Sequence, residues 1–272
     1  MVYSTHNQTA PQYSPDGRHI AFASDRGGVW QIWMSDADGT HLVLLSDAKS
    51  SEAGAPNWSP DGQKIAFDSR HSGHPEVFTV DISERMPHKL VANLSDMSAP
   101  SWSHDGKWLY FESNLQSNFQ SIFRSPVTGG TAVPVSAGTW PKESYDGKTL
   151  YVVNKDKSAT LYTVPLEAVG PESVLSGMPV AFHSKGWTVV PGGIYFVPAN
   201  SAKSVRSVDF ASRADAAKSV EYFDLATKHI RQIFKAEKGF NDGLSVTPDG
   251  HWILYTQEDD GSSDIMLVEH FR

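Results

Sequence analysis

The chain has 272 residues, with 23 lysine and arginine residues against 31 aspartate and glutamate residues, so its formal net charge is −8. No run of lysine or arginine exceeds two residues, so the sequence lacks the basic patch on which nucleic-acid binding depends. The absence of cysteine excludes disulfides, thiolate catalysis and cysteine-ligated zinc, and no apolar segment approaches the length needed to span a membrane.

The first six residues have neither the basic start nor the apolar stretch of a secretory signal. As the chain is written, this predicts a cytoplasmic product. Residues 2–4, Val-Tyr-Ser, have instead the composition of a short β-strand.

A motif of Ser or Thr, Pro, Asp and Gly recurs along the chain. Its glycines stand at positions 17, 62, 106, 147 and 250, and the first four are 41 to 45 residues apart. The gap of 103 residues before the last one fits two units, and Pro191-Gly192-Gly193 supplies the missing turn. Ser or Thr suits the first position of a type I turn, Pro the second and Gly the last. The sequence therefore predicts six hairpin turns.

Each turn leads into a short apolar strand, and further strands follow after loops. The second strands of the six units are predicted at residues 20–22, 65–67, 109–111, 150–152, 194–196 and 253–255. The third strands are predicted at residues 31–33, 77–79, 122–124, 161–163, 221–223 and 265–267. Fourth strands are predicted at residues 42–44, 89–91, 133–135, 173–175 and 231–233.

The sixth unit ends without a fourth strand, whereas the chain begins with the extra segment Val2-Tyr3-Ser4. If that segment forms the outer strand of the last unit, the ring closes with no exposed strand edge. The sequence thus predicts an all-β fold, a six-bladed β-propeller with four-stranded antiparallel blades whose last blade is closed by the N-terminal strand. The predicted single domain spans residues 1–272, with blades at 6–47, 48–96, 97–136, 137–176, 177–234 and 235–272 plus 1–5.

An Ala- and Ser-rich connection, Ser201–Lys218, lengthens the fifth unit. Long loops in compact domains are commonly surface excursions or functional lids, and propellers tolerate insertions at their loops. We expect a surface excursion here, with a lid as the alternative.

Residues 56–70, which begin Pro-Asn-Trp-Ser-Pro-Asp-Gly, resemble the WD40-like Pro-Asp repeat of the TolB β-propeller family. The resemblance covers nearly the whole chain and is strongest in blades one to three. More narrowly, residues 243–255 and 264–272 resemble the C-terminal propeller of bacterial transcriptional regulators that carry a winged-helix domain. This resemblance implies a sensing or scaffolding domain that forms the C-terminal part of a larger regulator. It also implies a periplasmic location if that regulator is anchored in the membrane.

Polar residues gather where a propeller usually binds its ligands. The loops that enter the inner strands and those that join second to third strands surround the central channel on one face, here called the channel face. Aligning the repeats by their turns places a predicted ligand-binding ring just before the inner strands, formed by His6, Asn7, Glu52, Asp96, His183, Asn241 and Asp242. The alternative is a purely local role, in which such side chains only cap turns and face solvent.

Part of this ring has the chemistry of a metal site. Calcium takes carboxylate oxygens, and zinc also accepts imidazole nitrogen, so the candidate ligands for calcium or zinc are His6, Glu52, His183 and Asp242. A second candidate pair is His71 and His74, in the loop between the second and third strands of blade two. That pair can share a metal only if the loop curls back, because no helix fixes the two rings.

Two further features concern matching positions of the repeat. Arg26 and Arg70 recur at matching blade positions, which favours a structural role over substrate binding. Glu143 replaces the aromatic residue found at the matching positions of blades one to three. A carboxylate there needs a partner, for which Lys142 or a channel metal is a candidate, unless blade four is locally exposed.

These patterns favour a non-catalytic binding or sensor propeller that takes a protein, peptide or small ligand at its channel face. We expect a monomer that contacts neither nucleic acid nor membrane through this domain. The alternative is a metal-dependent hydrolase of phosphotriesters or lactones, by analogy with six-bladed hydrolases that resemble paraoxonase and gluconolactonase. The sequence patterns of those enzymes are not matched, and no Gly-x-Ser-x-Gly motif supports a serine hydrolase.

Overall fold

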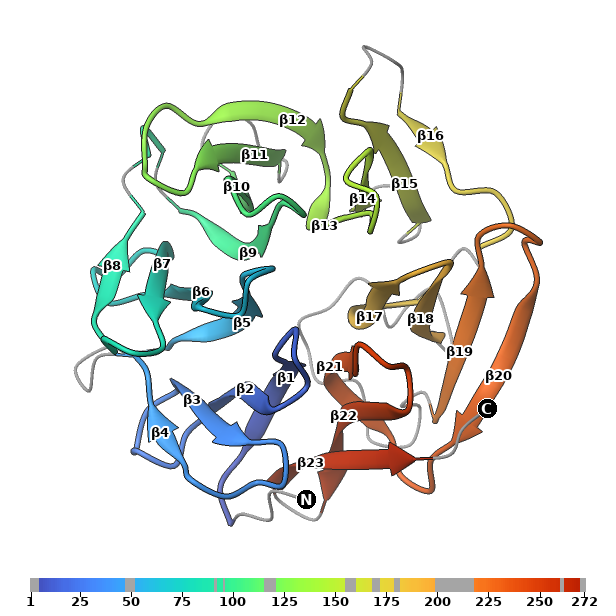
Figure 1. Cartoon of the computed structure of the whole chain (residues 1–272), viewed down its shortest axis with the longest axis horizontal. Coiled ribbons are helices and arrows are strands. Elements are labelled where there is room, and N and C mark those ends of the chain that lie inside the picture. The colour runs from blue at the N-terminus through green and yellow to red at the C-terminus, as the bar shows by residue number, and fades with distance from the viewer. Residues whose placement is uncertain are drawn as a thin grey trace.

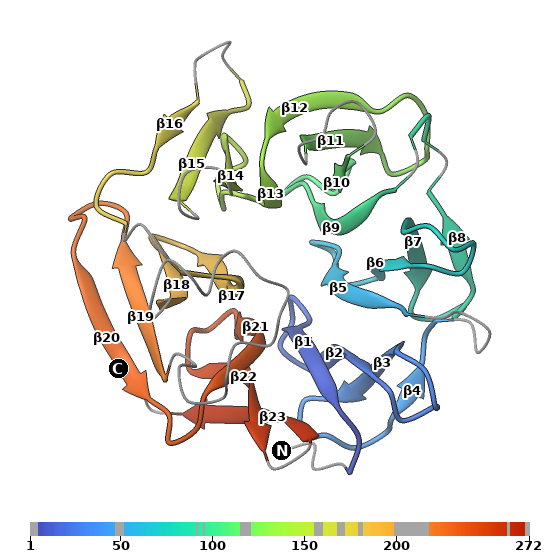
Figure 2. The same ribbon diagram turned by 180° about the vertical axis from the view of Figure 1, so that it is seen from behind.

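The computed structural model describes residues 5–46, 52–90, 92–94, 96–114, 121–154, 160–167, 172–178, 182–198, 218–259 and 262–269. Six antiparallel sheets are arranged in a ring about a central axis (Figure 1), and Figure 2 shows the same ring from behind. The predicted six-bladed, all-β propeller with four-stranded antiparallel blades is thereby confirmed. The described part of the chain contains no helix that could cross a membrane.

The first three blades follow one another along the chain. Blade one comprises β1 (Gln8–Tyr13), β2 (His19–Ser24), β3 (Gln31–Asp36) and β4 (Val43–Leu44). Blade two comprises β5 (Gly54–Trp58), β6 (Lys64–Ser69), β7 (Glu76–Asp81) and β8 (Pro87–Lys89). Blade three comprises β9 (Ser98–Trp102), β10 (Trp108–Ser113), β11 (Ser121–Pro126) and β12 (Val133–Ala137). The fourth strand of blade two thus begins before the predicted residues 89–91.

The other three blades complete the ring. Blade four comprises β13 (Thr139–Glu143), β14 (Thr149–Asn154), β15 (Thr160–Pro165) and β16 (Ser173–Val174). Blade five comprises β17 (Phe182–Val190), β18 (Gly193–Pro198), β19 (Ser219–Asp224) and β20 (Ile230–Lys235). Blade six comprises β21 (Phe240–Val246), β22 (Trp252–Asp259) and β23 (Ser262–Glu269), three strands in the described residues.

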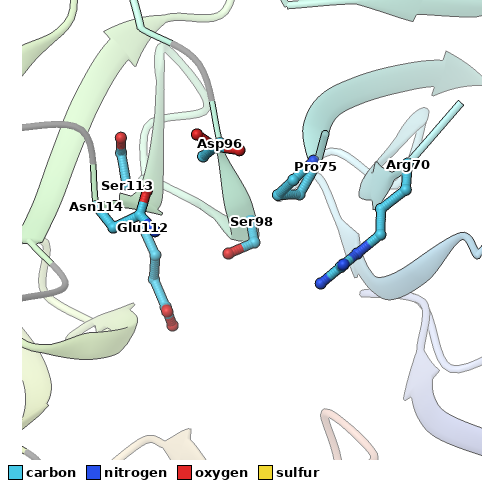
Figure 3. Close-up of a pocket in the computed structure, with 7 residues that line it drawn as sticks. All are labelled: Arg70, Pro75, Asp96, Ser98, Glu112, Ser113 and Asn114. Atoms are coloured by element: carbon cyan, nitrogen blue, oxygen red, sulfur yellow. The ribbon is translucent and has the colours of Figure 1, made fainter. Parts of the chain in front are cut away.

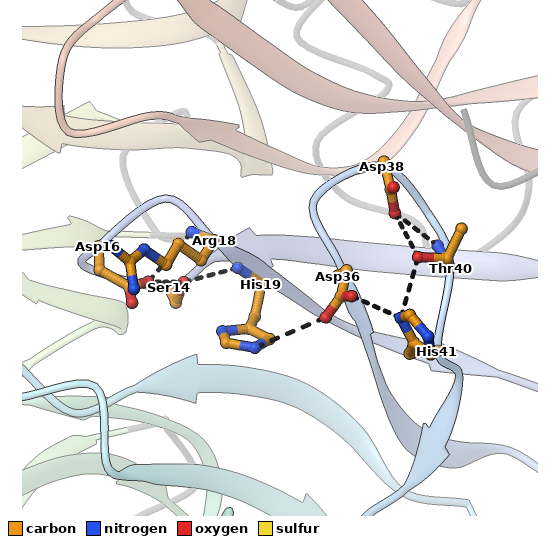
Figure 4. Close-up of polar contacts among 8 residues, drawn as sticks. All are labelled: Ser14, Asp16, Arg18, His19, Asp36, Asp38, Thr40 and His41. Atoms are coloured by element: carbon orange, nitrogen blue, oxygen red, sulfur yellow. Dashed lines mark hydrogen bonds and ion pairs between the residues drawn. The ribbon is translucent and has the colours of Figure 1, made fainter.

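One recurring hydrogen-bond network, here called the turn latch, fixes the predicted turns. In blade one, Ser14 Oγ donates to Asp16 Oδ1 at 2.5 Å and accepts from the His19 N–H at 2.9 Å. Asp16 Oδ1 also accepts from the Arg18 N–H at 3.0 Å (Figure 4). The same latch joins Ser59 to Asp61, Ser103 to Asp105, Ser144 to Asp146 and Thr247 to Asp249.

The latches keep their carboxylates charged. Hydrogen bonds from the Ser or Thr hydroxyl and then from a backbone N–H lower the pKa of the carboxyl groups of Asp61, Asp105, Asp146 and Asp249. The aspartate of the motif is therefore both a turn former and a fixed negative charge.

Next to the first latch lies a second hairpin of blade one. Asp36 Oδ2 lies 2.7 Å from His41 Nδ1, and its Oδ1 lies 3.7 Å from His19 Nε2. Thr40 Oγ1 donates to Asp38 Oδ1 at 2.6 Å, and Figure 4 shows these side chains grouped at the tip of the hairpin. The group is largely exposed, so we assign it a local role in holding the turn.

Four of the five latched turns also lie against the turn before them, on the face here called the turn face. A methyl group added at Gly62 would lie 3.5 Å from Pro15 Cδ, and one added at Gly106 would lie 3.8 Å from Pro60 Cδ. Gly17 has the same relation to Pro248, at 3.7 Å, so the first blade packs directly on the last. These turns therefore set the spacing between neighbouring blades.

The core lies between the blades rather than within one. One buried cluster joins Ile32 of blade one to Trp58 and Phe67 of blade two, and another joins Phe22 of blade one to Leu254 of blade six. The predicted aromatic residues also bridge blades by hydrogen bonding. Trp58 Nε1 donates to the Gln12 carbonyl at 3.1 Å, and Trp102 Nε1 donates to that of Asn57 at 3.0 Å. Burial of apolar side chains between sheets is thus the main force that holds the ring together.

Two sequence-based predictions fall on residues outside the described part of the chain. These are the closing strand Val2-Tyr3-Ser4 and all of the long connection Ser201–Lys218 except its last residue. The described residues do show the start of β1 against blade six, where Ser263 Oγ donates to the Gln8 carbonyl at 2.7 Å. The Tyr13 N–H likewise donates to Ser245 Oγ at 3.0 Å.

Removing one latch should destabilise the propeller measurably. Asp61→Ala deletes the acceptor for Ser59 and for a backbone N–H, which we expect to cost about 1 kcal/mol and to lower Tm by about 2–4 °C. Asp61→Asn keeps an acceptor oxygen and should lose less. Calorimetric melting of the three proteins checks this, and equal Tm values would contradict the latch.

The same variant carries a pH signature. Folding lowers the pKa of Asp61, so its contribution is fully present above the unfolded-state pKa near about 4 and is lost as the pH falls through the lower folded-state value. The stability gap between wild type and Asp61→Ala should therefore shrink below about pH 4. Urea unfolding at several pH values measures it, and a gap that widens in acid would overturn this assignment.

The closing strand is tested by truncation. Deleting residues 1–5 should expose an edge of blade six, because we predict that Val2-Tyr3-Ser4 pairs there. We expect either a large decrease in Tm, measured by scanning calorimetry, or aggregation, measured by light scattering. Unchanged melting would show that these residues do not close the ring.

Candidate binding site on the channel face

The two loop sets that the sequence predicts on one face are bonded to each other. The Ala53 N–H, in the loop that enters β5, donates to the Trp30 carbonyl of the β2–β3 loop at 2.9 Å. One blade further on, the Met97 N–H donates to the Pro75 carbonyl at 2.8 Å. The loops that enter β5 and β9 are thus tied to the preceding blade, and the side chains of both loop sets share the channel face.

Several members of the predicted ring lie against loops between second and third strands. Asn7 Nδ2 donates to Asp25 Oδ2 at 2.8 Å, and His6 Nδ1 lies 3.8 Å from Asp25 Oδ1. In blade two, Glu52 lies 3.6 Å from the Nε of Arg70. These contacts occur at the positions predicted for the ring in blades one and two.

The structure brings together residues that the sequence assigned to separate groups. His74 Nδ1, from the second candidate metal pair, lies 3.2 Å from Asp96 Oδ1 of the ring. His71 is exposed. Asp242 joins blades six and one through its carbonyl, which accepts from Thr9 Oγ1 at 3.3 Å and from Thr256 Oγ1.

The described residues do not form the predicted metal site. Among the described residues, no three His, Asp or Glu side chains gather closely enough to hold a metal ion. The side chains of His183 and Asn241 lie outside the described part of the structure. A calcium or zinc site that uses His6, Glu52, His183 and Asp242 therefore stays a prediction.

A pocket opens on the channel face between blades two and three, with a volume of about 260 Å³ (Figure 3). Its lining is mostly polar and consists of Arg70, Pro75, Asp96, Ser98, Glu112, Ser113 and Asn114. In Figure 3, Arg70 stands on one side and Glu112 on the other, with Asp96 and Ser98 between them. One cation and two carboxylates thus face a space large enough for a side chain or a small polar group.

The wall beside this pocket depends on two carboxylates. Glu112 is 3% exposed, and its Oε1 accepts from the Trp140 N–H of blade four at 2.7 Å. Asp68 does the same one blade earlier, accepting from the Ala99 N–H at 2.7 Å. Ala99 and Trp140 have φ values of 49° and 54°, at β-bulges that remove these N–H groups from regular pairing. Each carboxylate therefore satisfies a donor that the bulge has freed.

Sequence reasoning missed these two carboxylates, although a signal exists. Asp68 and Glu112 occupy the second-strand position at which blade one has Ala23 and blade four has Val153. A charged residue at a position that is apolar in blades one, four and five is the pattern that marks them.

Glu143 finds a partner that was not among the predicted ones. Its Oε1 accepts from the His104 N–H at 3.0 Å. Burial, and then the hydrogen bond to Glu143, raises the pKa of the Tyr110 hydroxyl.

Lys142 contacts blade five instead of Glu143. Its Nζ donates to the Trp187 carbonyl at 2.9 Å and lies 5.2 Å from the centroid of the Trp187 ring. Burial lowers the pKa of Lys142 to about 8.

The two matching arginines differ in their surroundings. The Arg26 guanidinium lies 5.0 Å from the Phe22 ring and 5.3 Å from that of Trp33, which fits the structural role expected of it. Arg70 has a side chain that is 58% exposed and lines the pocket. The repeat thus concealed a residue placed to contact a ligand.

The family model for the TolB β-propeller domain matches residues 45–216 of this chain. No curated protein matches the sequence. The comparison with known sequences therefore supports the repeat family and names no individual relative.

Solved structures share the fold at low sequence identity. TolB from Acinetobacter baumannii is 17% identical, with a TM-score of 0.74 over 94% of this chain and 62% of its own. A puromycin-hydrolyzing peptidase from Mycobacterium tuberculosis is 12% identical, with a TM-score of 0.63 over 97% of this chain and 51% of its own. A gluconolactonase from Xanthomonas campestris is 14% identical, with a TM-score of 0.68 over 97% and 86%. The chain thus spans less than two thirds of the first two proteins, and these likenesses concern the fold alone.

The role of Glu112 leads to a stability prediction. Glu112→Ala should leave the buried Trp140 N–H without its acceptor and cost about 1–3 kcal/mol, whereas Glu112→Gln keeps an acceptor and should cost less. Urea unfolding measures both, with the more exposed Asp96→Asn as the control, expected within about 0.5 kcal/mol of wild type. If Glu112→Ala is as stable as that control, the carboxylate does not support the bulge.

Proposed function

We propose that this chain, which belongs to the TolB β-propeller domain family, is a binding module that holds a peptide segment of a partner protein at its channel face. The observation that carries the proposal is the polar pocket between blades two and three. It presents Arg70 opposite Glu112 and beside Asp96, so that opposite charges face one small space.

Such a lining fits a polypeptide better than a purely apolar ligand. A peptide offers N–H donors and carbonyl acceptors side by side, which match the Ser98 and Ser113 hydroxyls and the charged groups around them. Arg70 is able to bind a carboxylate in a bidentate way, and Asp96 is able to bind a cation. The rigid strands behind the pocket would hold these groups in place without a large ordering cost.

The finer parts of the proposal have their own support. The likeness of residues 243–255 and 264–272 to regulator propellers supports a sensor domain within a larger regulator. A periplasmic location goes with this reading if the regulator is anchored in the membrane. The net charge of −8 favours a protein partner over a nucleic acid or an anionic membrane.

The alternative function, a metal-dependent lactonase or phosphotriesterase, has the shared fold of the gluconolactonase as its support. At 14% identity that likeness does not transfer catalytic residues. The predicted ligands His6, Glu52, His183 and Asp242 remain the ones that such an enzyme would use.

A selection experiment tests the binding function. Peptides selected from a random phage-displayed library on the immobilised protein should bind the purified protein in a calorimetric titration. Because Asp96 and Arg70 face the pocket, Asp96→Asn and Arg70→Ala should each weaken that binding about tenfold. Lys107→Ala, on the turn face, serves as the matched control and should leave binding unchanged. Equal affinities for all four proteins would refute the channel-face site.

The same protein preparation tests the alternative. Its metal content is measured, and a chromogenic phosphotriester and a lactone are assayed with and without a chelator. The binding proposal predicts no turnover above background. Chelator-sensitive turnover that disappears in Asp242→Ala, with the fold intact, would replace it with the hydrolase.

A further inference from the structure

The turn of blade five is two residues shorter than those of the other blades. Six residues, 14–19, lie between the paired Tyr13 and Ile20 of blade one, whereas only four, 190–193, lie between Val189 and Ile194 of blade five. The short turn also has Val190 where other blades have the Ser or Thr of the latch. The turn of blade five is therefore too short to extend as far as the other turns, and it lacks their hydrogen-bond latch.

The glycine of the short turn does not pack against the preceding turn as the glycines of other blades do. In four successive blade pairs the glycine of one turn lies against the preceding turn, the last being Gly147, whose added methyl would lie 3.8 Å from His104 Cβ. At Gly192 such a methyl would meet only Tyr222 Oη of its own blade, at 3.7 Å, and no atom of Tyr145 within 4 Å. The turns of blades four and five therefore stand apart.

A pocket of about 340 Å³ fills this gap on the turn face. Tyr145 and Asp146 of the blade-four turn form one side, and Val190 and Pro191 of the blade-five turn form the other. Leu225 closes one end, held by its N–H bond to the Gly192 carbonyl at 3.0 Å. This pocket lies on the opposite face from the channel-face site, so its role is independent of the proposed function.

The chemistry of the lining favours a cation attached to an apolar stem. Asp146 is the one charged side chain among the described residues that line the pocket. Its Oδ1 accepts both latch hydrogen bonds, at 2.6 Å and 3.1 Å, so that within the described part of the chain its Oδ2 is left for a ligand. These hydrogen bonds lower the pKa of Asp146, which keeps the carboxylate charged at neutral pH.

Tyr145 adds a second group suited to a cation. It is 61% exposed and stands at the turn position that Pro occupies in blades one and two. Its ring lies 5.4 Å from that of His104, which braces it from the side of blade three. An exposed tyrosine face beside a carboxylate attracts guanidinium and ammonium groups, while Val190, Pro191 and Leu225 offer apolar surface for an aliphatic stem.

We propose that this turn-face pocket binds an arginine or lysine side chain of a partner protein's segment. Asp146 takes the charge, Tyr145 covers the face of the cation, and the short turn of blade five packs on the stem. The charge complementarity at Asp146 and Tyr145 selects a basic partner segment over an acidic one.

Two synthetic pentapeptides provide the probe, acetyl-Ala-Leu-Arg-Leu-Ala-amide and the same peptide with Glu in place of Arg. Each is titrated into the ¹⁵N-labelled protein while the amide signals of Tyr145, Gly192 and Leu225 are followed by NMR. We expect saturable shifts of these signals with the arginine peptide and none with the glutamate peptide. Absence of shifts at about 10 mM arginine peptide, a concentration that detects even affinities weaker than about 1 mM, would overturn the proposal.

Variants locate the interaction. Asp146→Asn keeps the latch acceptor but removes the charge, and Tyr145→Pro introduces the residue of blades one, two and six, so each should weaken binding about threefold to fivefold. Asp61→Asn makes the same change in the latch of blade two, whose turn packs against that of blade one, and should bind like wild type. If Asp61→Asn weakens binding as much as Asp146→Asn, the effect is not that of the pocket. Circular dichroism confirms that each variant is folded.

Discussion

Four neighbouring pairs of blades are joined on the turn face by one kind of contact, that of a latched turn with the turn before it. The latch fixes the shape of the turn by three hydrogen bonds, two accepted by the carboxylate and one by the hydroxyl. The turn then places its glycine against the proline of the preceding blade. Gly62 on Pro15 and Gly106 on Pro60 are two examples, and Gly17 on Pro248 joins the two ends of the ring. Apolar side chains fill the spaces that this contact defines, so the hydrophobic core inherits its geometry from the turns.

The opposite end of the channel is built by a different device. There the inner strands carry β-bulges, and Asp68 and Glu112 each accept the N–H that a bulge frees in the next blade. A carboxylate is tolerated away from water only where it is hydrogen-bonded, and the freed N–H groups provide those bonds. Polar groups therefore remain at the channel face. A propeller therefore offers its polar, adaptable surface on the face away from the regular turns, which is the face that we propose for ligand binding.

The sequence predicts the architecture well because the repeat records it directly. The Pro-Asp-Gly turns count the blades, and Pro191-Gly192-Gly193 was correctly identified as the turn of blade five. The site is predicted less completely, since loop residues such as Asn7 and Asp96 can be placed by alignment but their partners come from neighbouring blades. The charge of Glu112 stands out in the repeat, but its hydrogen bond connects positions 28 residues apart, so the local sequence does not reveal its partner. The second pocket arises from a turn shortened by two residues, whose effect appears only when neighbouring blades are packed together.

The central claim is that the length of the turn decides whether neighbouring blades touch on the turn face. The most direct measurement replaces residues 190–193 with the six-residue turn of blade two, residues 59–64, and determines the crystal structure of the resulting protein. We expect the glycine of the grafted turn to pack against Tyr145 and the pocket between blades four and five to disappear. A ring in which the grafted turn forms its latch while the pocket stays open would contradict the claim.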